Sequence, residues 1–309
     1  MSTEAPQRGS SAAPRFLCIG DIDVDVLIRV DRLPTRDGKV NGTLLQRAPG
    51  GMAANVAVGL ARLGAAVRVL GRVGDDDDAA FALEALATAG IETDFVTRMA
   101  GTRTFTCLGL ITPDGEKSLV KLMSPAYRPS VEDVSDAACQ AATHLHLTSA
   151  GDGALCRRVV AAAQQTGATA SLDVERADCL GTPEALAAAI AGFDVLFCNA
   201  EARASLDRLL PAGLAGRVPV VITTLGAEGA SVETGGERLA APGFPADVRD
   251  TTGAGDCFAA ACLHARLVQH LDWSAALRFA NRAASLSTAG YGAQSALPTL
   301  GEVNAALAQ

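Results

Sequence analysis

The sequence has 309 residues, of which 49% are apolar, so the chain can bury a large core without help from disulfides or metals. Its formal charge is −8 at pH 7 and its pI is about 5.1. This balance argues against a nucleic-acid partner, because binding to nucleic-acid phosphates rewards a strongly basic surface. A small anionic ligand is still compatible with it, since a few local basic residues can hold one.

The cysteines and the N-terminal segment indicate the cellular setting. The eight cysteines form no C-x-x-C pair and have none of the spacings of zinc ligands, so we interpret them as reduced core residues of a cytoplasmic protein. Residues 1–15 mix Ser, Ala, Pro and charge without an apolar segment, which predicts a flexible tail. No uninterrupted apolar run reaches the roughly 20 residues of a spanning helix, so no membrane association is expected.

Short β-branched or apolar segments alternate with longer Ala- and Leu-rich segments along most of the chain. Strands are predicted at residues 16–19, 67–70, 144–147, 170–173, 195–198 and 218–223. Helices are predicted at residues 55–63, 79–89, 154–165 and 183–190, and a long helical stretch at 254–289. Such alternation predicts a mostly parallel central sheet covered by helices on both faces, which is an α/β/α sandwich of three layers.

Two segments depart from this alternation, at about residues 26–47 and 103–122. The second has alternating residues around Pro113-Asp114-Gly115, a combination typical of hairpins. We expect both segments to form a small β-lid that projects from the main sheet. Because no linker or internal repeat interrupts residues 16–309, we predict one domain with a lid.

The first predicted strand ends in a polar segment with three acids, Gly20-Asp21-Ile22-Asp23-Val24-Asp25. Side chains alternate along an extended chain, so the three carboxylates are expected on one face. Charges beside a buried strand are costly unless they meet solvent or ligand hydroxyls. We therefore predict that Asp25, and after it Asp23, binds a substrate at the carboxyl end of the sheet.

Two further segments place glycines directly before a helix. Gly50 and Gly51 precede an Ala-rich segment in which Asn55 is a poor helix former, so this amide either caps the helix locally or reaches a bound polyol. The second segment, residues 250–256, reads Asp-Thr-Thr-Gly-Ala-Gly-Asp. Its unpaired N–H groups and the positive end of the helix dipole predict an anion site that suits a transferring phosphate.

Asp256 falls on the first turn of the helix that follows this segment. A carboxylate in that position can be a simple cap that interacts with the helix dipole. Beside a set of N–H donors it can also accept the proton of an attacking hydroxyl while the donors stabilise the developing charge. Those two functions, with positioning, are most of what phosphoryl transfer requires of a protein.

The two segments, GG-x-x-x-N followed by D-T-x-GAGD, resemble the signatures of the PfkB, or ribokinase-like, family of carbohydrate and nucleoside kinases. The resemblance covers the chain after residue 15. It implies a ribokinase-like fold, the cofactors ATP and Mg²⁺, and transfer of the γ-phosphoryl group to a hydroxyl, typically primary, of a sugar-like substrate.

The resemblance also implies roles for individual residues. Asp256 takes the place of the general base, and the amides of Gly253, Ala254 and Gly255 that of the anion hole. Substrate contacts fall on Gly50, Gly51, Asn55 and Asp25, and ATP contacts on Asn199, Thr224, Gly226, Gly229, Gly253 and Gly255. A monovalent-cation loop, for which K⁺ is the implied ion, falls on Asp250, Thr252, Ser287, Gly290 and Gly292.

One position departs from the family pattern. The family motif N-x-x-E, whose Glu helps to organise Mg²⁺ and phosphate, is replaced by Asn199-Ala200-Glu201-Ala202, with the acid one residue early. Asn199 keeps its expected role, whereas Glu201 is a weaker candidate for the organisation of the metal.

The acceptor and the oligomer stay open. Lys39 and Arg103 fall near lid positions that bind the acidic group of phosphosugars, unless both are solvated lid-edge residues, and the composition favours a sugar or an acidic sugar derivative. A nucleoside would prefer aromatic platforms, for which Phe105 and Tyr127 are the candidates. A catalytically idle ligand-binding relative is a third alternative, which the intact Gly-Ala-Gly-Asp segment disfavours. Lid strands often need an edge partner, so a homodimer through the lid is also expected.

Overall fold

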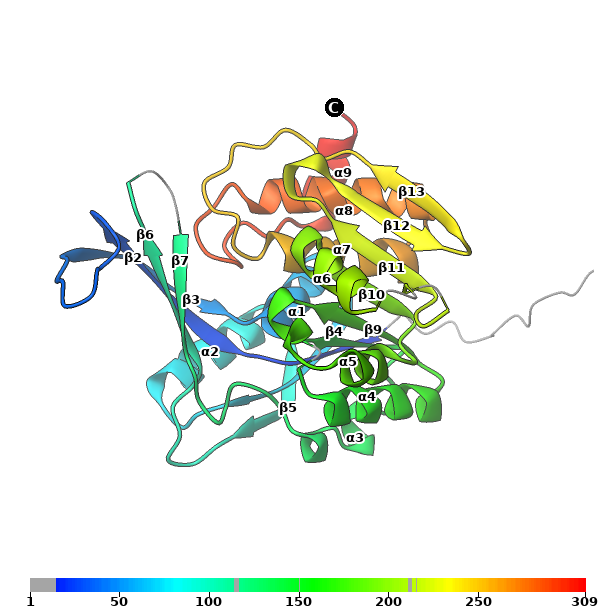
Figure 1. Ribbon diagram of the computed structural model, residues 1–309, viewed down its shortest axis with the longest axis horizontal. Coiled ribbons are helices and arrows are strands. Elements are labelled where there is room, and N and C mark those ends of the chain that lie inside the picture. The colour runs from blue at the N-terminus through cyan, green and yellow to red at the C-terminus, as the bar shows by residue number, and fades with distance from the viewer. Residues whose placement is uncertain (1–14, 114–116, 150, 211–212, 215) are drawn as a thin grey trace, which may run out of the picture.

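The computed structural model describes residues 15–113, 117–149, 151–210, 213–214 and 216–309. The expected tail lies outside these ranges except for Arg15, which already belongs to the first strand, β1 (Arg15–Ile19). Asp114 and Gly115 of the expected hairpin turn also lie outside them. The described chain forms two sheets with helices around the larger one (Figure 1).

The larger sheet has nine strands in the order β13-β12-β11-β10-β9-β8-β1-β4-β5. From β5 to β11 all neighbours pair in parallel, and only β12 and β13 are antiparallel additions at one edge. All six predicted strands are in this sheet. Besides β1, its strands are β4 (Ala66–Val73), β5 (Glu92–Arg98), β8 (His144–Thr148), β9 (Thr169–Val174), β10 (Val195–Asn199), β11 (Val220–Thr224), β12 (Ala230–Thr234) and β13 (Glu237–Ala241). The central strands are buried on both faces, which explains their continuous apolar runs.

Each face of the sheet has its own apolar core. One core contains residues of α1 (Met52–Arg62), α2 (Asp77–Thr88), α7 (Ala254–Leu267), α8 (Trp273–Ser287) and α9 (Leu300–Leu307). The other contains residues of α3 (Asp136–Cys139), α4 (Gly153–Thr166), α5 (Pro183–Ile190) and α6 (Ala200–Leu209). The predicted three-layer α/β/α sandwich is therefore confirmed. All eight cysteines are buried, seven of them in these two cores and Cys107 outside them.

The helical stretch predicted at residues 254–289 is two helices rather than one. His270 has a φ of 56°, which a continuing helix cannot accommodate, and the Asp272 side chain accepts a hydrogen bond from Ala275 N at 2.8 Å to begin α8. A sequence rich in Ala and Leu on both sides of the break hides this turn. In the described part of the chain, no helix is long and apolar enough to cross a membrane.

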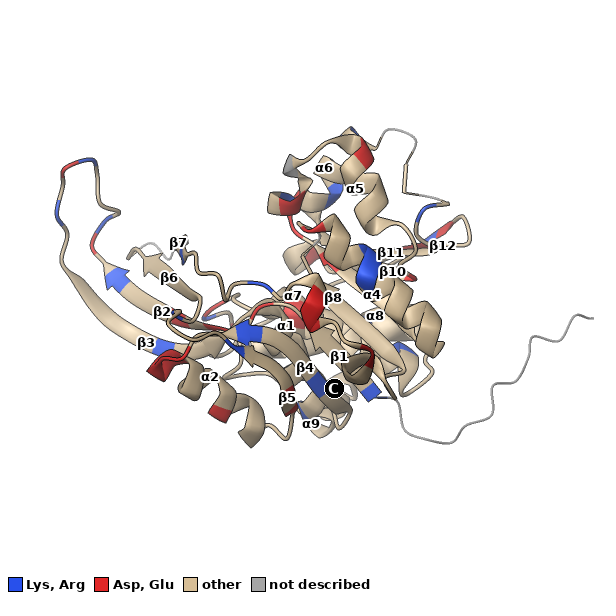
Figure 2. Cartoon of the chain, turned by 90° about the horizontal axis from the view of Figure 1, so that it is seen from below, with Lys and Arg blue, Asp and Glu red and all other residues tan. Residues whose placement is uncertain are grey.

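The smaller sheet has the order β3-β2-β6-β7 and contains both segments that were expected to form a lid. Its strands are β2 (Asp23–Val30), β3 (Gly42–Gly50), β6 (Thr106–Ile111) and β7 (Lys117–Leu122). Figure 2 shows the β2–β3 arm extending from the body of the molecule, with Lys, Arg and Asp residues gathered at its tip. The sheet begins closer to the core than predicted, since β2 starts at Asp23 and β3 ends at Gly50. The acidic segment is thus part of this sheet.

Candidate active site

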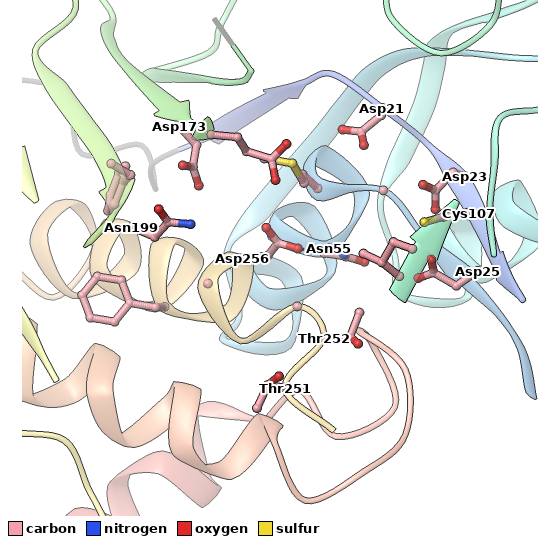
Figure 3. Close-up of a pocket in the computed structure, with 18 of the residues that line it drawn as sticks. Asp21, Asp23, Asp25, Asn55, Cys107, Asp173, Asn199, Thr251, Thr252 and Asp256 are labelled. Atoms are coloured by element: carbon pink, nitrogen blue, oxygen red, sulfur yellow. Dashed lines mark hydrogen bonds between the residues drawn. The ribbon is translucent and has the colours of Figure 1, made fainter. Parts of the chain in front are cut away.

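A cavity of about 390 Å³ lies where the two sheets meet, at the carboxyl ends of β1, β9, β10 and β11 (Figure 3). The main sheet, the smaller sheet and the start of α7 all contribute to its wall. Its lining includes Asp21, Asp23, Asp25, Asn55, Phe105, Lys121, Asp173, Glu175, Asn199, Thr224 and Asp256, together with Gly51, Gly253 and Gly255.

Asp256 lies on the first turn of α7 with 9% of its surface exposed. The cap residue of this helix is Gly253, and no side chain caps it. The carboxylate instead accepts a hydrogen bond from Asn55 Nδ2 at 2.8 Å, across the interface between α1 and α7 (Figure 3). Burial raises the pKa of Asp256 well above its usual range, and this outweighs the opposing effect of the Asn55 hydrogen bond. Asp256 is thus a buried carboxylate of unusually high proton affinity.

The turn before Asp256 depends on a left-handed glycine. Gly253 has a φ of 75°, and a Cβ on it would lie within 3.0 Å of three atoms of Ala293. Both facts exclude a side chain here and let the backbone pass close to the cavity. Gly253 and Gly255 line the cavity, whereas Ala254 does not, and Ala254 N donates to Thr251 O at 3.2 Å. The geometry therefore favours the Gly253 and Gly255 amides over that of Ala254 as donors to a ligand.

The three acids of the β1–β2 segment all line the cavity, in keeping with the predicted alternation. Asp21 accepts hydrogen bonds from Ala53 N at 3.4 Å and Thr148 Oγ1 at 3.2 Å. Asp23 is only 4% exposed, and its Oδ1 has no hydrogen-bond partner among the described residues. Burial and then the negative charge of Asp25 raise the pKa of Asp23 well above its usual range. A ligand that donates hydrogen bonds would satisfy this buried oxygen.

Gly50 explains how two of these carboxyl groups come together. A Cβ on Gly50 would lie within 3.0 Å of both Asp23 Oδ1 and Asp25 Oδ2, so the absence of a side chain leaves the space that both oxygens occupy. Gly50 itself does not line the cavity, whereas Gly51 does. Gly50 thus contributes by leaving space for the carboxyl groups of Asp23 and Asp25.

A second pair of acids follows β9. Asp173 and Glu175 line the cavity, and neither was singled out from the sequence, although Asp173 ends a predicted strand, where ligands of parallel sheets gather. Burial, with smaller contributions from Glu175 and Asp178, raises the pKa of Asp173 to about 7. The cavity is therefore strongly acidic on two sides.

Lys121 of β7 is the one Lys or Arg among the described residues that line the cavity. Its Nζ lies 3.6 Å from Glu175 Oε2 and 3.5 Å from Tyr127 Oη, so it connects the smaller sheet to the end of β9. Lys39 and Arg103 are exposed and do not line the cavity. In this conformation, then, neither of the two cations expected to face the substrate does so.

Of the residues expected to contact ATP, some line the cavity and others do not. Asn199 and Thr224 line the cavity, and Asn199 begins α6 by accepting a hydrogen bond from Ala202 N at 2.8 Å. Gly226 and Gly229 form the turn after β11, outside the cavity wall. Glu201 is 71% exposed on its side chain, lies 3.7 Å from Arg176 and does not line the cavity. Its displacement by one residue therefore turns it away from the site.

Some of the residues expected to form the cation loop are joined by hydrogen bonds. Asp250 accepts hydrogen bonds from Thr252 N at 3.0 Å, Thr252 Oγ1 at 2.6 Å and Gly292 N at 2.9 Å. Ser287 ends α8, where its hydroxyl donates to Ala284 O at 2.9 Å. Gly290 packs against Ser295 and Ala296, two residues of the same C-terminal turn. The loop before α7 and the turn after α8 are thus fastened to each other through Asp250.

These features define an α/β protein with a small-ligand cavity beside a helix N-terminus. The model of the pfkB family of carbohydrate kinases matches residues 13–300. The chain is 35% identical over 96% of its length to the ATP-dependent ribose-1-phosphate kinase of Halopiger xanaduensis, of which the match covers 98%. It is 31% identical over 94% of its length to the ribokinase of Bacillus subtilis, again covering 98% of the relative.

A solved structure gives the same result. The ribokinase of Arabidopsis thaliana in complex with ribose and ATP matches with a TM-score of 0.79 and 26% identity, over 96% of this chain and 99% of that one. The chain therefore belongs to the pfkB family of carbohydrate kinases.

Proposed function

We propose that this protein transfers the γ-phosphoryl group of ATP to a hydroxyl of a sugar, with Asp256 as the general base. The observation that carries the proposal is the position of Asp256, a buried carboxylate between an acid-lined cavity and the glycine turn at the start of α7. The similarity to a ribose-1-phosphate kinase and to two ribokinases supports ATP as the donor and ribose or ribose 1-phosphate as the kind of acceptor.

In the proposed mechanism, the acceptor hydroxyl approaches Asp256 from the cavity and gives up its proton as its oxygen attacks the γ-phosphorus. The carboxylate must be ionised to do this, and its raised pKa makes it a stronger base than an exposed Asp. The amides of Gly253 and Gly255 and the dipole of α7 stabilise the charge on the moving phosphoryl group. Attack, proton transfer and charge stabilisation then all occur at one helix end.

The residues present fit a Mg²⁺ ion that arrives with ATP. Mg²⁺ prefers oxygen ligands and is usually held by one or two carboxylates together with phosphates and water. Asp173 and Glu175 offer such carboxylates beside Asn199, and they would take over the role that Glu201 cannot fill from its exposed position. Among the described side chains, no group of three or more His, Cys, Asp or Glu is placed to hold a metal alone. When bound, the ion neutralises phosphate charge.

The loop around Asp250 is proposed as a monovalent-cation site for K⁺. Its support is the hydrogen bonding of Asp250 to Thr252 and Gly292, which brings a carboxylate and two turns together directly before the proposed anion site. Initial rates in K⁺, Na⁺ and tetramethylammonium chloride at equal ionic strength test it. A rate that is independent of the cation would refute a K⁺ role.

The electrostatics of the cavity favour an uncharged sugar as the acceptor. Six of its lining residues are acids, and the unpartnered Oδ1 of Asp23 calls for a hydroxyl donor rather than a second anion. A phosphosugar is the second candidate, because Lys121 faces the cavity and one relative is a ribose-1-phosphate kinase. A nucleoside is the third, since Phe105 lines the cavity and packs against Tyr127 at 4.4 Å between ring centroids.

The deciding experiment is ADP formation with Mg²⁺ and K⁺ against ribose, fructose, ribose 1-phosphate, a sugar acid and nucleosides, with product analysis. Turnover with a free sugar at the highest kcat/KM supports the proposal, and preference for ribose 1-phosphate or a nucleoside replaces the acceptor class. If calorimetry detects sugar binding but no acceptor is turned over, the idle-relative alternative is correct.

We also propose that the smaller sheet mediates a homodimer. Leu44, Val120, Leu122 and Met123 are all exposed large apolar residues on this sheet or at its end, and such residues favour association. Light scattering should give about twice the mass of the chain. A Leu44→Lys, Leu122→Lys double variant should then be monomeric, and a monomeric wild type would refute the proposal.

A further inference from the structure

Gln294 lies next to the proposed base without touching it. It follows α8 in the C-terminal turn, and its Nε2 donates to Asn55 Oδ1 at 2.9 Å. The other end of the same amide, Asn55 Nδ2, donates to Asp256 Oδ2 at 2.8 Å. One continuous chain of hydrogen bonds therefore joins three elements that are far apart in sequence, namely the C-terminal turn, α1 and α7.

The turn that carries Gln294 is fixed from two sides. Gly292 N donates to Asp250 Oδ2 at 2.9 Å, which fastens the turn to the loop before α7. Ala293 packs so closely against Gly253 that a Cβ on the glycine would lie within 3.0 Å of it. Gln294 is therefore held in place relative to the helix that carries Asp256.

The direction of this chain matters because an amide can face either way. Asn55 is 4% exposed, so its two ends must be matched to partners within the protein. A carboxylate accepts hydrogen bonds only, and Asp256 therefore requires the NH₂ end of Asn55. With Gln294 donating to Oδ1, the opposite orientation would place two donors against each other and two acceptors against each other. The Asp256 carboxylate thus sets the orientation of Asn55, and Gln294 holds Asn55 in it by donating to the remaining oxygen.

We propose that Gln294 is a positioning residue for phosphoryl transfer, which acts through Asn55 to fix the orientation of the Asp256 carboxylate. With Oδ2 held by Asn55, Oδ1 is the oxygen that takes the proton of the acceptor hydroxyl. This inference rests on the proposed function for its kinetic consequence, but the hydrogen-bond chain has its own readout in the titration of Asp256.

The negative charges around Asp256 make the hydrogen bond from Asn55 important for the ionisation of Asp256. Asp21 and Asp23 face it from the β1–β2 segment, and Asp173 and Glu175 face it from the end of β9. Lys121 of β7 is the one cation on the same cavity wall among the described residues. Since the carboxylates disfavour the ionised form of Asp256, the Asn55 donor is one of the few groups that favour it, and its loss shifts the carboxyl toward the protonated, inactive form.

The test compares Gln294→Leu and Gln294→Glu with Ser295→Ala, all in the full chain with ATP and the best sugar of the acceptor panel. Neither replacement at 294 can donate to Asn55 Oδ1, whereas Ser295 is an exposed residue of the same turn whose hydroxyl donates to Tyr291 O. We expect kcat to fall about 10-fold to 100-fold in both Gln294 variants, as for a misplaced catalytic group. The KM for ATP should stay within about twofold, and the acid limb of the pH profile should move to higher pH.

A double-mutant cycle separates positioning from a general structural effect. In an Asn55→Ala background, Gln294→Leu should cost less than about twofold in kcat, because its route to Asp256 is already cut. Independent, multiplicative losses would overturn the proposal, as would a Gln294→Leu enzyme with wild-type kcat and pH profile.

The second readout does not depend on turnover. Carboxyl carbon NMR of ¹³C-labelled Asp, with the Asp256 signal assigned by its loss in Asp256→Asn, follows the titration of this group directly. The proposal requires Gln294→Leu to move that titration to higher pH while Ser295→Ala leaves it in place. An unmoved titration refutes it, and this holds even if the wild-type protein phosphorylates nothing and the proposed function itself fails.

Discussion

The two walls of the cavity are built in different ways. The base side is made by backbone geometry, since Gly253 in a left-handed conformation delivers the chain into α7 and aims amides at the cavity. The acceptor side is made by side chains, namely the carboxyl groups of Asp23 and Asp25 from β2 and the amine of Lys121 from β7. Backbone geometry tolerates few substitutions, whereas side chains can be exchanged one by one. Under the proposed function, the base side would therefore set the reaction and the acceptor side the substrate.

The largest effect that this comparison predicts is at the base. Asp256→Asn keeps the shape of the side chain and one acceptor oxygen for Asn55, but it replaces the other oxygen by an NH₂ donor and cannot take a proton. Turnover should fall about 10²-fold to 10⁴-fold, the range that a positioned general base contributes. ATP affinity by calorimetry and the unfolding midpoint should change little. An Asp256→Asn enzyme with near-native kcat would show that another group is the base.

The glycine turn should be intolerant of even one carbon atom. Gly253→Ala introduces a Cβ at positive φ and within 3.0 Å of Ala293, so we expect a loss of about 1–3 kcal/mol in the free energy of unfolding. The matched variant is Gly255→Ala, two residues on, where a Cβ would meet no heavy atom of the described residues within 4 Å outside its own helix and chain neighbours. Urea unfolding of both proteins decides, and equal stabilities would show that the turn relaxes without cost.

The acceptor side should be adjustable by single exchanges. Asp23→Asn removes a buried acid that has an unpartnered oxygen and negative neighbours. Relative to a free sugar, an anionic acceptor should then gain about tenfold in kcat/KM, equivalent to ~1.4 kcal/mol. The ratio of kcat/KM for ribose and ribose 1-phosphate measures this. An unchanged ratio would mean that Asp23 does not control the charge of the acceptor.

The smallest effect is expected at Lys121. Its contact with Glu175 is long at 3.6 Å and about two-fifths exposed on both side chains, so Lys121→Met should change the free energy of unfolding by less than about 1 kcal/mol. If the acceptor is a free sugar, its KM should also stay within about threefold. A much larger rise in KM, confined to an anionic acceptor, would favour the phosphosugar candidate instead.

The sequence was most informative where a function is carried by consecutive residues. The parallel sheet followed from the alternation of apolar strands and Ala-rich helices, and residues 250–256 predicted an anion turn, which stays a prediction. Gln294 and Glu175 escaped notice because neither belongs to a local pattern. Their place at the site depends on which strands are neighbours and on a contact between residues 239 positions apart.

The displaced acid shows a different limit. The sequence indicated that Glu201 departs from the expected spacing, but only the structure shows that it points toward Arg176 and away from the cavity. The sequence could not show that Asp173 and Glu175 line the same cavity as Asn199, because this depends on β9 and β10 being neighbours in the sheet. Lys39 and Arg103 were likewise assigned by analogy of position, and the structure leaves Lys39 exposed between β2 and β3 and Arg103 exposed between β5 and β6.

The start of β2 has one more consequence. Asp23 and Asp25 belong to the smaller sheet, whereas Asp256 belongs to a helix packed on the larger one. The smaller sheet therefore carries the carboxyl groups that are proposed to bind the sugar. A helix on the larger sheet carries the carboxyl group that is proposed to deprotonate it. A change in the angle between the two sheets would therefore change the distance from Asp23 and Asp25 to Asp256.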